Sequence, residues 1–221
     1  MLENIITAYN EAIFDTDRDR ALQVVHDAEA SGISPEDIVF HIVLPAMDLM
    51  VKSISEHFDA NLAQHFMTAQ IADTVTAEMI KKFKKSPLVR GVVVLGTASG
   101  DMHSLGKRIV LGCLRARMID VHDLGVNVAP ERFVDEAVSC HARVIGISAM
   151  MVHTARGEHG CLAVRRLLRE RGLDGQVRII VGGAPFRFDA ELFKAIEADT
   201  WAPDAVTAAK VIEDLIAEVH P

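Results

Sequence analysis

Up to about residue 85, the hydrophobic residues recur at helical spacing and almost no strand pattern is present. The first helical face comprises Leu2, Ile5, Ile6, Tyr9, Ala12 and Ile13. Ser34 followed by Pro35 is typical of a helix start, and Pro45 is expected to kink or split the helix that follows. A last helix is predicted from about Leu62 to Lys85. The pattern therefore predicts a bundle of four or five helices.

Beyond Pro87 the pattern changes to short apolar runs that alternate with helical stretches. The predicted strands are Gly91–Leu95, Ile119–Leu124, Val144–Ser148, Arg178–Val181 and Thr200–Ala202. The predicted helices are Lys107–Arg117, Pro130–Cys140, Thr154–Arg171, Ala190–Ile196 and Ala205–Val219. This alternation favours an α/β fold with a Rossmann-like, five-stranded parallel sheet in the flavodoxin-like order 2-1-3-4-5. We therefore predict two domains, a helical domain at 1–86 and an α/β domain at 87–221.

Composition and charge restrict the function more than they restrict the fold. Hydrophobic residues make up 50% of the 221 residues, which is typical of a globular protein. The formal net charge of −8 argues against nucleic acid as a partner, because binding to phosphates needs concentrated Lys and Arg. We see neither a leader pattern nor an apolar run of membrane-span length, so we expect a cytoplasmic protein with no membrane partner. Three widely spaced cysteines, Cys113, Cys140 and Cys161, are expected to be free thiols.

Polar and glycine residues with chemical potential collect in the loops that follow the predicted strands. They are Asp101 and His103 after the first strand, Ser148 and Thr154 at and after the third, and Gly182 and Gly183 after the fourth. Because parallel strands end at one edge of a sheet, we expect these residues to lie together. A carboxylate two positions from a histidine is suited to orient its ring. Neither GxGxxG nor GxxxxGK[ST] is present, which argues against a dinucleotide or P-loop site.

Three motifs in these loops together resemble the cobalamin-binding signature DxHxxG…SxL…GG. They are Asp101-x-His103-x-x-Gly106, Ser148-x-Met150 and Gly182-Gly183, with 41 residues between Gly106 and Ser148 as in that family. Met150 replaces the usual leucine, which conserves volume. From about residue 15 to 216, the chain resembles the small corrinoid carrier proteins of methanol- and methylamine-type methyltransferase systems. It is also similar to the cap and cobalamin domains of methionine synthase.

The resemblance implies a helical cap followed by a cobalamin-binding domain, and it assigns roles to the loop residues. His103 would ligate cobalt in place of the cofactor's own base, Asp101 would hold the second ring nitrogen, and Thr154 would complete this relay. Ser148 would bond the displaced nucleotide tail, and the glycine pair would leave room for it. The predicted cofactor-binding residues are Asp101, His103, Ser104, Gly106, Ser148, Met150, Thr154, Gly182 and Gly183. His103 is the one predicted metal ligand, and no residue is predicted to be catalytic.

The resemblance also implies movement and coverage by the cap. Phe58, Phe66 and Met67 are candidates to cover the upper face of the corrin. The linker around 86–90 is expected to act as a hinge, because the cap must move aside for each partner.

We therefore predict a corrinoid-binding methyl carrier, a non-catalytic subunit of a methyltransferase system. It would shuttle a methyl group on cobalt between a substrate-specific methyltransferase and a second methyltransferase with a thiol or pterin acceptor. A reductive activase is a further candidate partner. The alternative is a cobalamin-dependent light or redox sensor, although the chain has no room for a signalling domain and its one tryptophan, Trp201, lies outside the cap. A third option, the small subunit of an adenosylcobalamin mutase, is disfavoured by the helical cap.

Two further segments are interpreted as structural. The run from Arg165 to Arg171 is interpreted as a solvated helix face. Glu197-Ala198-Asp199 stands where many relatives have Gly-Ala-Asp, which raises the question of how the turn before the last strand is formed.

Overall fold

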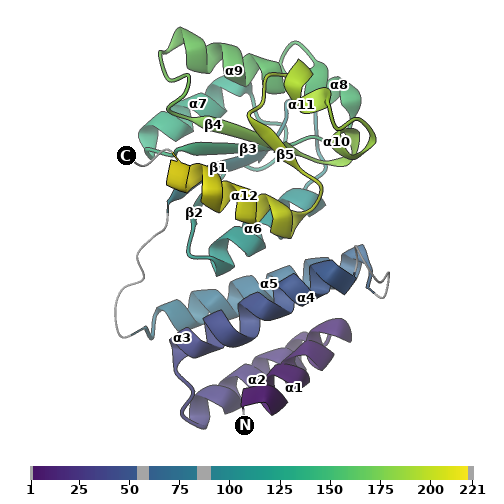
Figure 1. Ribbon diagram of the computed structural model, residues 1–221, viewed down its shortest axis with the longest axis vertical. Helices are drawn as coiled ribbons and strands as arrows, with labels where there is room; N and C mark the ends of the chain where they lie inside the picture. Colours follow the sequence, from purple (N-terminus) through teal and green to yellow (C-terminus); the bar gives the residue numbers. More distant parts are fainter. Residues whose placement is uncertain (1, 54–59, 84–90, 219–221) are drawn as a thin grey trace. The chain divides into compact units, whose positions relative to one another are not determined.

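The computed structural model describes residues 2–53, 60–83 and 91–218 (Figure 1). The chain divides into two compact units, one made of Met1–Leu88 with Gly112–Met118 and the other of Val89–Leu111 with Ile119–Pro221. The predicted boundary at 86/87, the predicted hinge at 86–90 and the cap candidate Phe58 lie outside the described residues.

The N-terminal unit is a helical bundle, as predicted. Its elements are α1 (Leu2–Phe14), α2 (Arg18–Ala30), α3 (Pro35–Asp37), the π-helix η1 (Ile38–Val43), α4 (Leu44–Lys52) and α5 (Leu62–Ile80). The α5 helix packs against α1, α2 and α4. The fully buried core between the helices includes Tyr9, Ile13, Ile38, Ile42, Met50, Ile71 and Met79. Of the first predicted face, Tyr9, Ala12 and Ile13 are buried, Ile5 and Ile6 are half-buried, and Leu2 is exposed.

Pro45 changes the hydrogen bonding of its helix, but the helical segment from α3 through η1 to α4 is continuous. A proline has no N–H to donate to the preceding turn. The chain responds with the π-helix η1 directly before it, in which the N–H of Leu44 donates to the carbonyl of Val39. Helix starts follow the expected local chemistry, since the Ser34 side chain accepts from the N–H of Asp37 and Asn61 forms a capping box with Gln64.

The second unit is a five-stranded parallel sheet in the order β2-β1-β3-β4-β5, which confirms the predicted topology. Its strands are β1 (Val92–Thr97), β2 (Asp120–Asp123), β3 (Val144–Ser148), β4 (Arg178–Gly182) and β5 (Thr200–Ala202). Its helices are α6 (Leu105–Ala116), α7 (Pro130–Ser139), α8 (Val152–Arg156), α9 (Cys161–Glu170), α10 (Ala184–Phe188), α11 (Leu192–Ala195) and α12 (Ala205–Glu218). Figure 1 shows α7 and α9 on one face of the sheet and α6 and α12 on the other.

Two helical details differ from the prediction. The stretch predicted as one helix over Thr154–Arg171 is two helices, α8 and α9, and the chain turns between them at 157–160. A Cβ at Gly160 would lie 2.7 Å from the carbonyl oxygen of Thr154, so glycine permits this tight turn. The short helix α10 follows the glycine pair directly, where only a loop was expected.

The strand register places the starts of the predicted site loops at the same level of the sheet. Thr97 of β1 pairs with Ser148 of β3, and Ser148 pairs with Gly182 of β4. Three strands therefore end level with one another, and the segments that follow them begin side by side. Beneath this edge the core is formed by Val94, Ile145, Ile147, Ile179 and Val181 with Phe133 and Leu168 of the covering helices.

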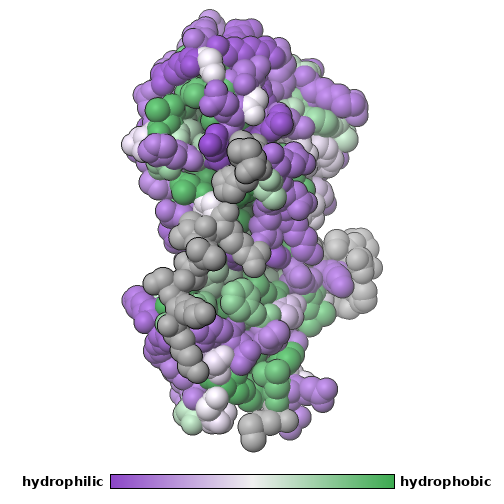
Figure 2. All heavy atoms as spheres, turned by 60° about the vertical axis from the view of Figure 1, so that its left-hand side comes forward, coloured by the Kyte–Doolittle hydropathy of each residue, from purple (hydrophilic) through white to green (hydrophobic). Residues whose placement is uncertain are grey.

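The visible surface of the α/β unit in Figure 2 is covered mostly by hydrophilic residues, with hydrophobic residues in smaller groups between them. Among the helices in the described ranges, none combines the length and the apolar character needed to cross a bilayer.

Candidate functional site

Asp101 lies at the centre of the predicted site, in the loop between β1 and α6. Its side chain is fully buried, and both carboxylate oxygens accept hydrogen bonds. Oδ1 accepts from the backbone N–H of His103 and from Nδ1 of its ring, each at 2.9 Å. Oδ2 accepts from the backbone N–H of Met150 at 2.6 Å and from the hydroxyl of Thr154 at 3.0 Å. The structure thus brings together Asp101 and His103 from the loop after β1, Met150 from the loop after β3 and Thr154 from α8.

This environment keeps Asp101 charged. Burial raises the pKa of the carboxyl group, but hydrogen bonds from Met150, His103 and Thr154 outweigh burial and hold the pKa below its ordinary value. An ionised carboxylate only accepts hydrogen bonds, so the proton shared with His103 is assigned to Nδ1 of the imidazole. In the neutral form of this imidazole, the other nitrogen, Nε2, carries a lone pair. Because 57% of the His103 side chain is exposed, this lone pair is accessible to a ligand or metal.

Thr97 and Asn127 hold the loop that carries Asp101. The Thr97 hydroxyl donates to the carbonyl of Asp101 at 2.7 Å, and the N–H of Asn127 donates to the same oxygen at 2.9 Å. The side-chain oxygen of Asn127 accepts from the N–H of Gly100 at 2.7 Å. The sequence placed Asn127 in a loop at this edge but gave it no role, because its partners are 26 or more positions away in the chain.

Lys107 and Asp123 form an ion pair beside the site that the sequence motifs did not predict. The Lys107 side chain is only 3% exposed and pairs with the Asp123 carboxylate, which also accepts from the N–H of Gly125 at 2.9 Å. The pair ties the start of α6 to the end of β2. A buried lysine needs such a partner, since burial of an isolated ammonium group is costly.

Met150 acts through its backbone, which explains why methionine is compatible with a position where the signature has leucine. Its N–H reaches Asp101, whereas 49% of the residue is exposed. Ser148 lies at the end of β3, and its carbonyl accepts from the N–H of Ala98 at 2.9 Å. The backbone of this loop is therefore tied to both β1 and Asp101.

The two glycines of the pair are under different constraints. Gly183 has a φ of +122°, and a Cβ there would lie 2.0 Å from the carbonyl oxygen of Ala149, so the fold requires glycine. At Gly182 an added Cβ would make only an ordinary contact, 3.5 Å from the carbonyl oxygen of Ala202. At the start of α6, Ser104 accepts from the N–H of Arg108 through its carbonyl. A Cβ at Gly106 would meet no atom within 4 Å, so open space lies beside this predicted residue.

Exposed apolar side chains gather in the segments after β1, β3 and β4. They are Met102 (66% exposed), Leu105 (40%), Met150 (49%), Val152 (54%) and Phe188 (91%). An accessible imidazole nitrogen, an orienting buried carboxylate and exposed apolar side chains in the segments that follow these strand ends suit a large ligand with an apolar body and a metal centre. The residues present therefore fit a corrinoid whose cobalt accepts a histidine ligand.

The remaining predictions concern residues away from Asp101. Phe66 and Met67 are half-buried in α5. His153 and His159 are exposed.

The interpretation of Arg165 as part of a solvated helix face is wrong. Its side chain is 6% exposed and donates to the carbonyl of Glu197 and to the carboxylates of Asp174 and Asp199, at 2.8, 2.8 and 2.5 Å. Glu197 has a φ of +55°, in the left-handed region that favours glycine. This conformation explains the glycine of the family pattern, and the turn forms here because the Glu197 carbonyl is held by Arg165 and its carboxylate pairs with Arg169.

Comparison with known proteins supports the fold and the cofactor. Residues 91–210 match the family model described as the B12 binding domain. The chain is 31% identical over 220 residues to the dimethylamine corrinoid protein of Methanosarcina barkeri, covering 97% of this chain and 99% of that relative. The predicted resemblance to corrinoid proteins and the predicted cofactor are thereby confirmed.

Two solved structures share the fold at lower identity. A cobalamin-binding protein from Desulfitobacterium hafniense DCB-2 aligns with a TM-score of 0.75 and 19% identity, covering 95% of this chain and 98% of that chain. The methanol:cobalamin methyltransferase complex of Methanosarcina barkeri contains a chain that aligns with a TM-score of 0.75 and 22% identity, covering 97% and 80%. Taken with the matched B12 binding domain and the full-length relative, the site around Asp101 and His103 shows that the chain belongs to the family of corrinoid-binding proteins.

Proposed function

We propose that the protein is a methyl carrier, in which His103 Nε2 ligates the cobalt of a bound corrinoid. The single observation that carries this proposal is the hydrogen-bonded chain from Thr154 through Asp101 to His103, which ends on an accessible ring nitrogen. When bound, the corrinoid supplies a cobalt centre that accepts a methyl group and gives it up again. None of the residues assigned here would react with the methyl group; the protein would control the ligation of the metal through His103.

The three residues have distinct tasks. Asp101 holds the proton on Nδ1 of His103, which leaves Nε2 as the ligand and increases its basicity. Thr154 donates to the opposite carboxylate oxygen and fixes the orientation of the carboxylate. A proton delivered to Nε2 would remove the lone pair, so the protonation state of this relay controls whether His103 can act as a ligand.

The other predicted residues would hold the rest of the cofactor. Ser148 would bond the displaced nucleotide base, and Gly182 with Gly183 would leave space for the tail, as the family signature implies. Ser104, Gly106 and Met150 would line the surface beside His103, where Gly106 faces open space. In the helical unit, Phe66 and Met67 would cover the upper face of the corrin.

The proposed partners are methyltransferases. One relative is named as a dimethylamine corrinoid protein, and a structural neighbour comes from a methanol:cobalamin methyltransferase complex. We propose a substrate-specific methyltransferase that delivers the methyl group, a second that passes it to a thiol or pterin, and a reductive activase. We place the carrier in the cytoplasm, where its free cysteines Cys113, Cys140 and Cys161 would stay reduced. These relatives offer no observation in favour of the sensor alternative.

Spectroscopy of the loaded full chain tests the proposal. We expect wild-type protein to bind hydroxocobalamin with the cofactor's own base displaced, and the reduced Co(II) form to show nitrogen coupling from His103 in its EPR spectrum. His103→Ala should lose that coupling, while the control His153→Gln, an exposed histidine of the same edge, should keep it. A protein that stays colourless, or a spectrum unchanged in His103→Ala, would contradict the proposal.

Methyl transfer separates the carrier from the sensor. Protein loaded with methylcobalamin should lose its methyl group to a cognate methyltransferase in the dark. A large conformational response to light, without such transfer, would favour the sensor instead.

A further inference from the structure

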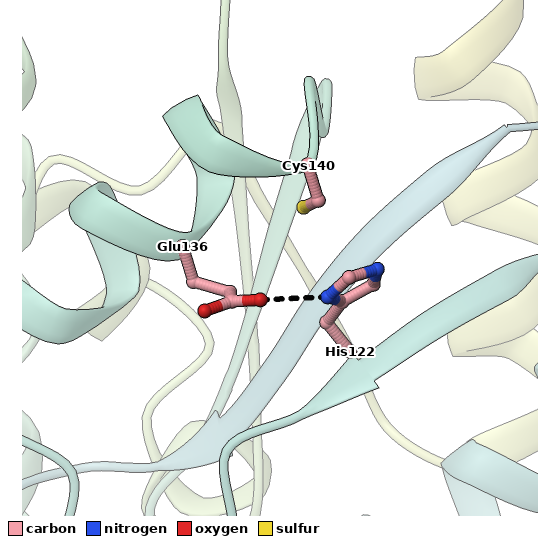
Figure 3. A group of neighbouring side chains, drawn as sticks. All are labelled: His122, Glu136 and Cys140. Carbon is pink, nitrogen blue, oxygen red and sulfur yellow. Dashed lines mark hydrogen bonds and ion pairs between the residues drawn. The ribbon is translucent and has the colours of Figure 1, made fainter.

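A second cluster of side chains with metal-binding chemistry lies on the α/β unit, outside the residues around Asp101. It consists of His122 on β2 and of Glu136 and Cys140 at the C-terminal end of α7. The three side chains point toward one another (Figure 3), and their nitrogen, oxygen and sulfur atoms lie within 4.8 Å of one another. Nδ1 of His122 is 2.7 Å from Oε1 of Glu136.

The fold creates this convergence from two local rules. Residues four positions apart on a helix share one face, so Glu136 and Cys140 are presented together. Their helix follows β2 in the chain, and β2 is an edge strand of the sheet. Because α7 also packs against β1, the neighbour of β2, His122 meets Glu136 and Cys140 on the face of the sheet that α7 covers.

We propose that His122, Glu136 and Cys140 form a binding site for a thiophilic divalent cation of the zinc class, with water in the fourth position. An imidazole, a carboxylate and a thiolate are the ligands that zinc accepts, whereas magnesium and calcium bind oxygen ligands. The inference does not depend on the proposed methyl-carrier function, because none of these residues belongs to the cobalamin signature.

The observed geometry is close to that of a bound ion. Tetrahedral zinc with ordinary bond lengths separates its ligand atoms by roughly 3.3–3.6 Å. Side-chain rotation must therefore open the contact between His122 and Glu136 by about half an ångström and bring the Cys140 sulfur nearer. Because the His122 and Glu136 side chains are 35% and 34% exposed, an ion can reach them without unfolding of the protein.

Binding has a defined proton balance. The ion would take the place between Nδ1 of His122 and the Glu136 carboxylate, and the imidazole proton would move to Nε2, on the side of Asp120, whose Oδ2 is 3.9 Å away. The Cys140 thiol would release one proton to solvent as the zinc–sulfur bond forms. No oxidation or reduction is involved.

The charges beside the cluster favour a cation. Glu136 belongs to the cluster, and the carboxylate of Asp120 lies 3.9 Å from Nε2 of His122. These negative charges favour a divalent cation, which in turn stabilises the Cys140 thiolate.

An ion here would connect β2 to α7 across the loop at 124–129. That loop includes Asn127, whose backbone and side chain hold the Asp101 loop. Zinc binding to the folded state should therefore raise the melting temperature of the α/β unit.

The test uses untagged, corrinoid-loaded full chain and zinc chloride, with the affinity measured by calorimetry or against a chromophoric chelator. We expect one zinc ion per chain and at least a tenfold loss of affinity in Cys140→Ser and in His122→Gln. The matched control is His26→Gln, since His26 also faces a carboxylate, Glu78 at 3.2 Å, but is not one of the described His/Cys/Asp/Glu groups whose donor atoms converge. A second control, His153→Gln, accounts for zinc held by an exposed histidine outside the cluster.

A second measurement follows the thiol directly. Zinc should slow alkylation of Cys140 by iodoacetamide, with the buried Cys113 and Cys161 as internal references. The proposal is overturned if zinc fails to bind at millimolar concentration, or if affinity and Cys140 protection are unchanged in His122→Gln. It is equally overturned if His153→Gln or His26→Gln, rather than Cys140→Ser, abolishes the binding.

Discussion

Two aspartates lie at opposite ends of the strands of the same parallel sheet. Asp101 follows the carboxyl end of β1, and Asp199 precedes the amino end of β5. Both accept several hydrogen bonds, and both are buried or nearly so, with side chains 0% and 19% exposed. They differ in the charge of their donors.

Asp199 is neutralised by cations. It accepts from Arg165 at 2.5 Å and Arg178 at 3.1 Å, and from the N–H of Ile179 at 2.6 Å. Among the described residues, Asp101 accepts instead from two backbone N–H groups, a hydroxyl and an imidazole. Its negative charge is therefore balanced by dipoles and remains available to polarise His103. The number of hydrogen bonds thus does not distinguish the proposed binding site from a structural tie, whereas the exposed His103 imidazole at the end of the Asp101 network does.

The largest effect on stability is expected for Asp199, at the amino-terminal ends of the strands. Asp199→Ala should lower the free energy of unfolding by about 3 kcal/mol, because it leaves the buried Arg165 with less counter-charge and the N–H of Ile179 without its acceptor. Urea denaturation measures this loss. The control Asp174→Ala removes a partner that is 45% exposed and should cost less than about 1 kcal/mol.

Measuring the affinity of Asp199→Ala for corrinoid separates an effect on stability from an effect on cofactor binding. The folded fraction of Asp199→Ala should still bind hydroxocobalamin with wild-type affinity. A loss of affinity without a loss of stability would contradict the structural role of this edge.

The second largest effect tests the backbone of the carboxyl edge. Gly183→Ala should destabilise the fold by about 2 kcal/mol, because its Cβ would collide with the carbonyl oxygen of Ala149 and its φ of +122° disfavours a side chain. Gly182→Ala is the matched control and should leave thermal stability nearly unchanged, since its Cβ meets only an ordinary contact. Equal melting temperatures for the two variants would show that the glycine pair has no such difference.

The third prediction concerns how the free energy of unfolding depends on pH through the Asp101 carboxylate. The pKa of Asp101 is lowered on folding from its ordinary value of 3.8, so between these two values the unfolded chain binds more protons than the folded protein. The contribution of Asp101 is present above the ordinary value and is lost as the pH falls through the folded value. Asp101→Asn should therefore flatten the decline in unfolding free energy below about pH 5, measured by urea titrations at several pH values. If the unfolding free energy of Asp101→Asn declines with falling pH as steeply as that of the wild type, Asp101 does not make this contribution.

The smallest effect is expected at the turn before β5. Glu197→Gly should raise the free energy of unfolding by about 0.5 kcal/mol, because glycine adopts the observed φ of +55° without strain. The exposed ion pair with Arg169 that is lost contributes little. Glu197→Ala loses the same ion pair but keeps the strained backbone, so it should not stabilise the protein; a gain equal to that of glycine would contradict the conformational explanation.

The predictions from sequence were most accurate where the signal is local. Short apolar runs identified the five strands, and the rule of right-handed crossovers led to the observed order β2-β1-β3-β4-β5. The Asp101–His103 pair was also visible, because two positions of separation suffice for their contact. The division of the 154–171 stretch into α8 and α9 was missed, since the apolar residues on both sides of the turn keep a helical pattern.

Long-range contacts separate what the chain alone determined from what the tertiary structure decided. The sequence alone determined the two-part organisation into helices and a parallel sheet, and its motif pointed to a corrinoid. The tertiary structure decided that Met150 supplies a backbone N–H and that Asn127 and Thr97 hold the Asp101 carbonyl. It also decided that Arg165 is buried against Asp199 and that His122 faces Glu136. The physical reason is that these hydrogen bonds join residues that are distant in the chain. Their approach depends on strand register, such as Thr97 beside Ser148 beside Gly182, and on how the helices pack on the sheet, neither of which hydrophobic periodicity encodes.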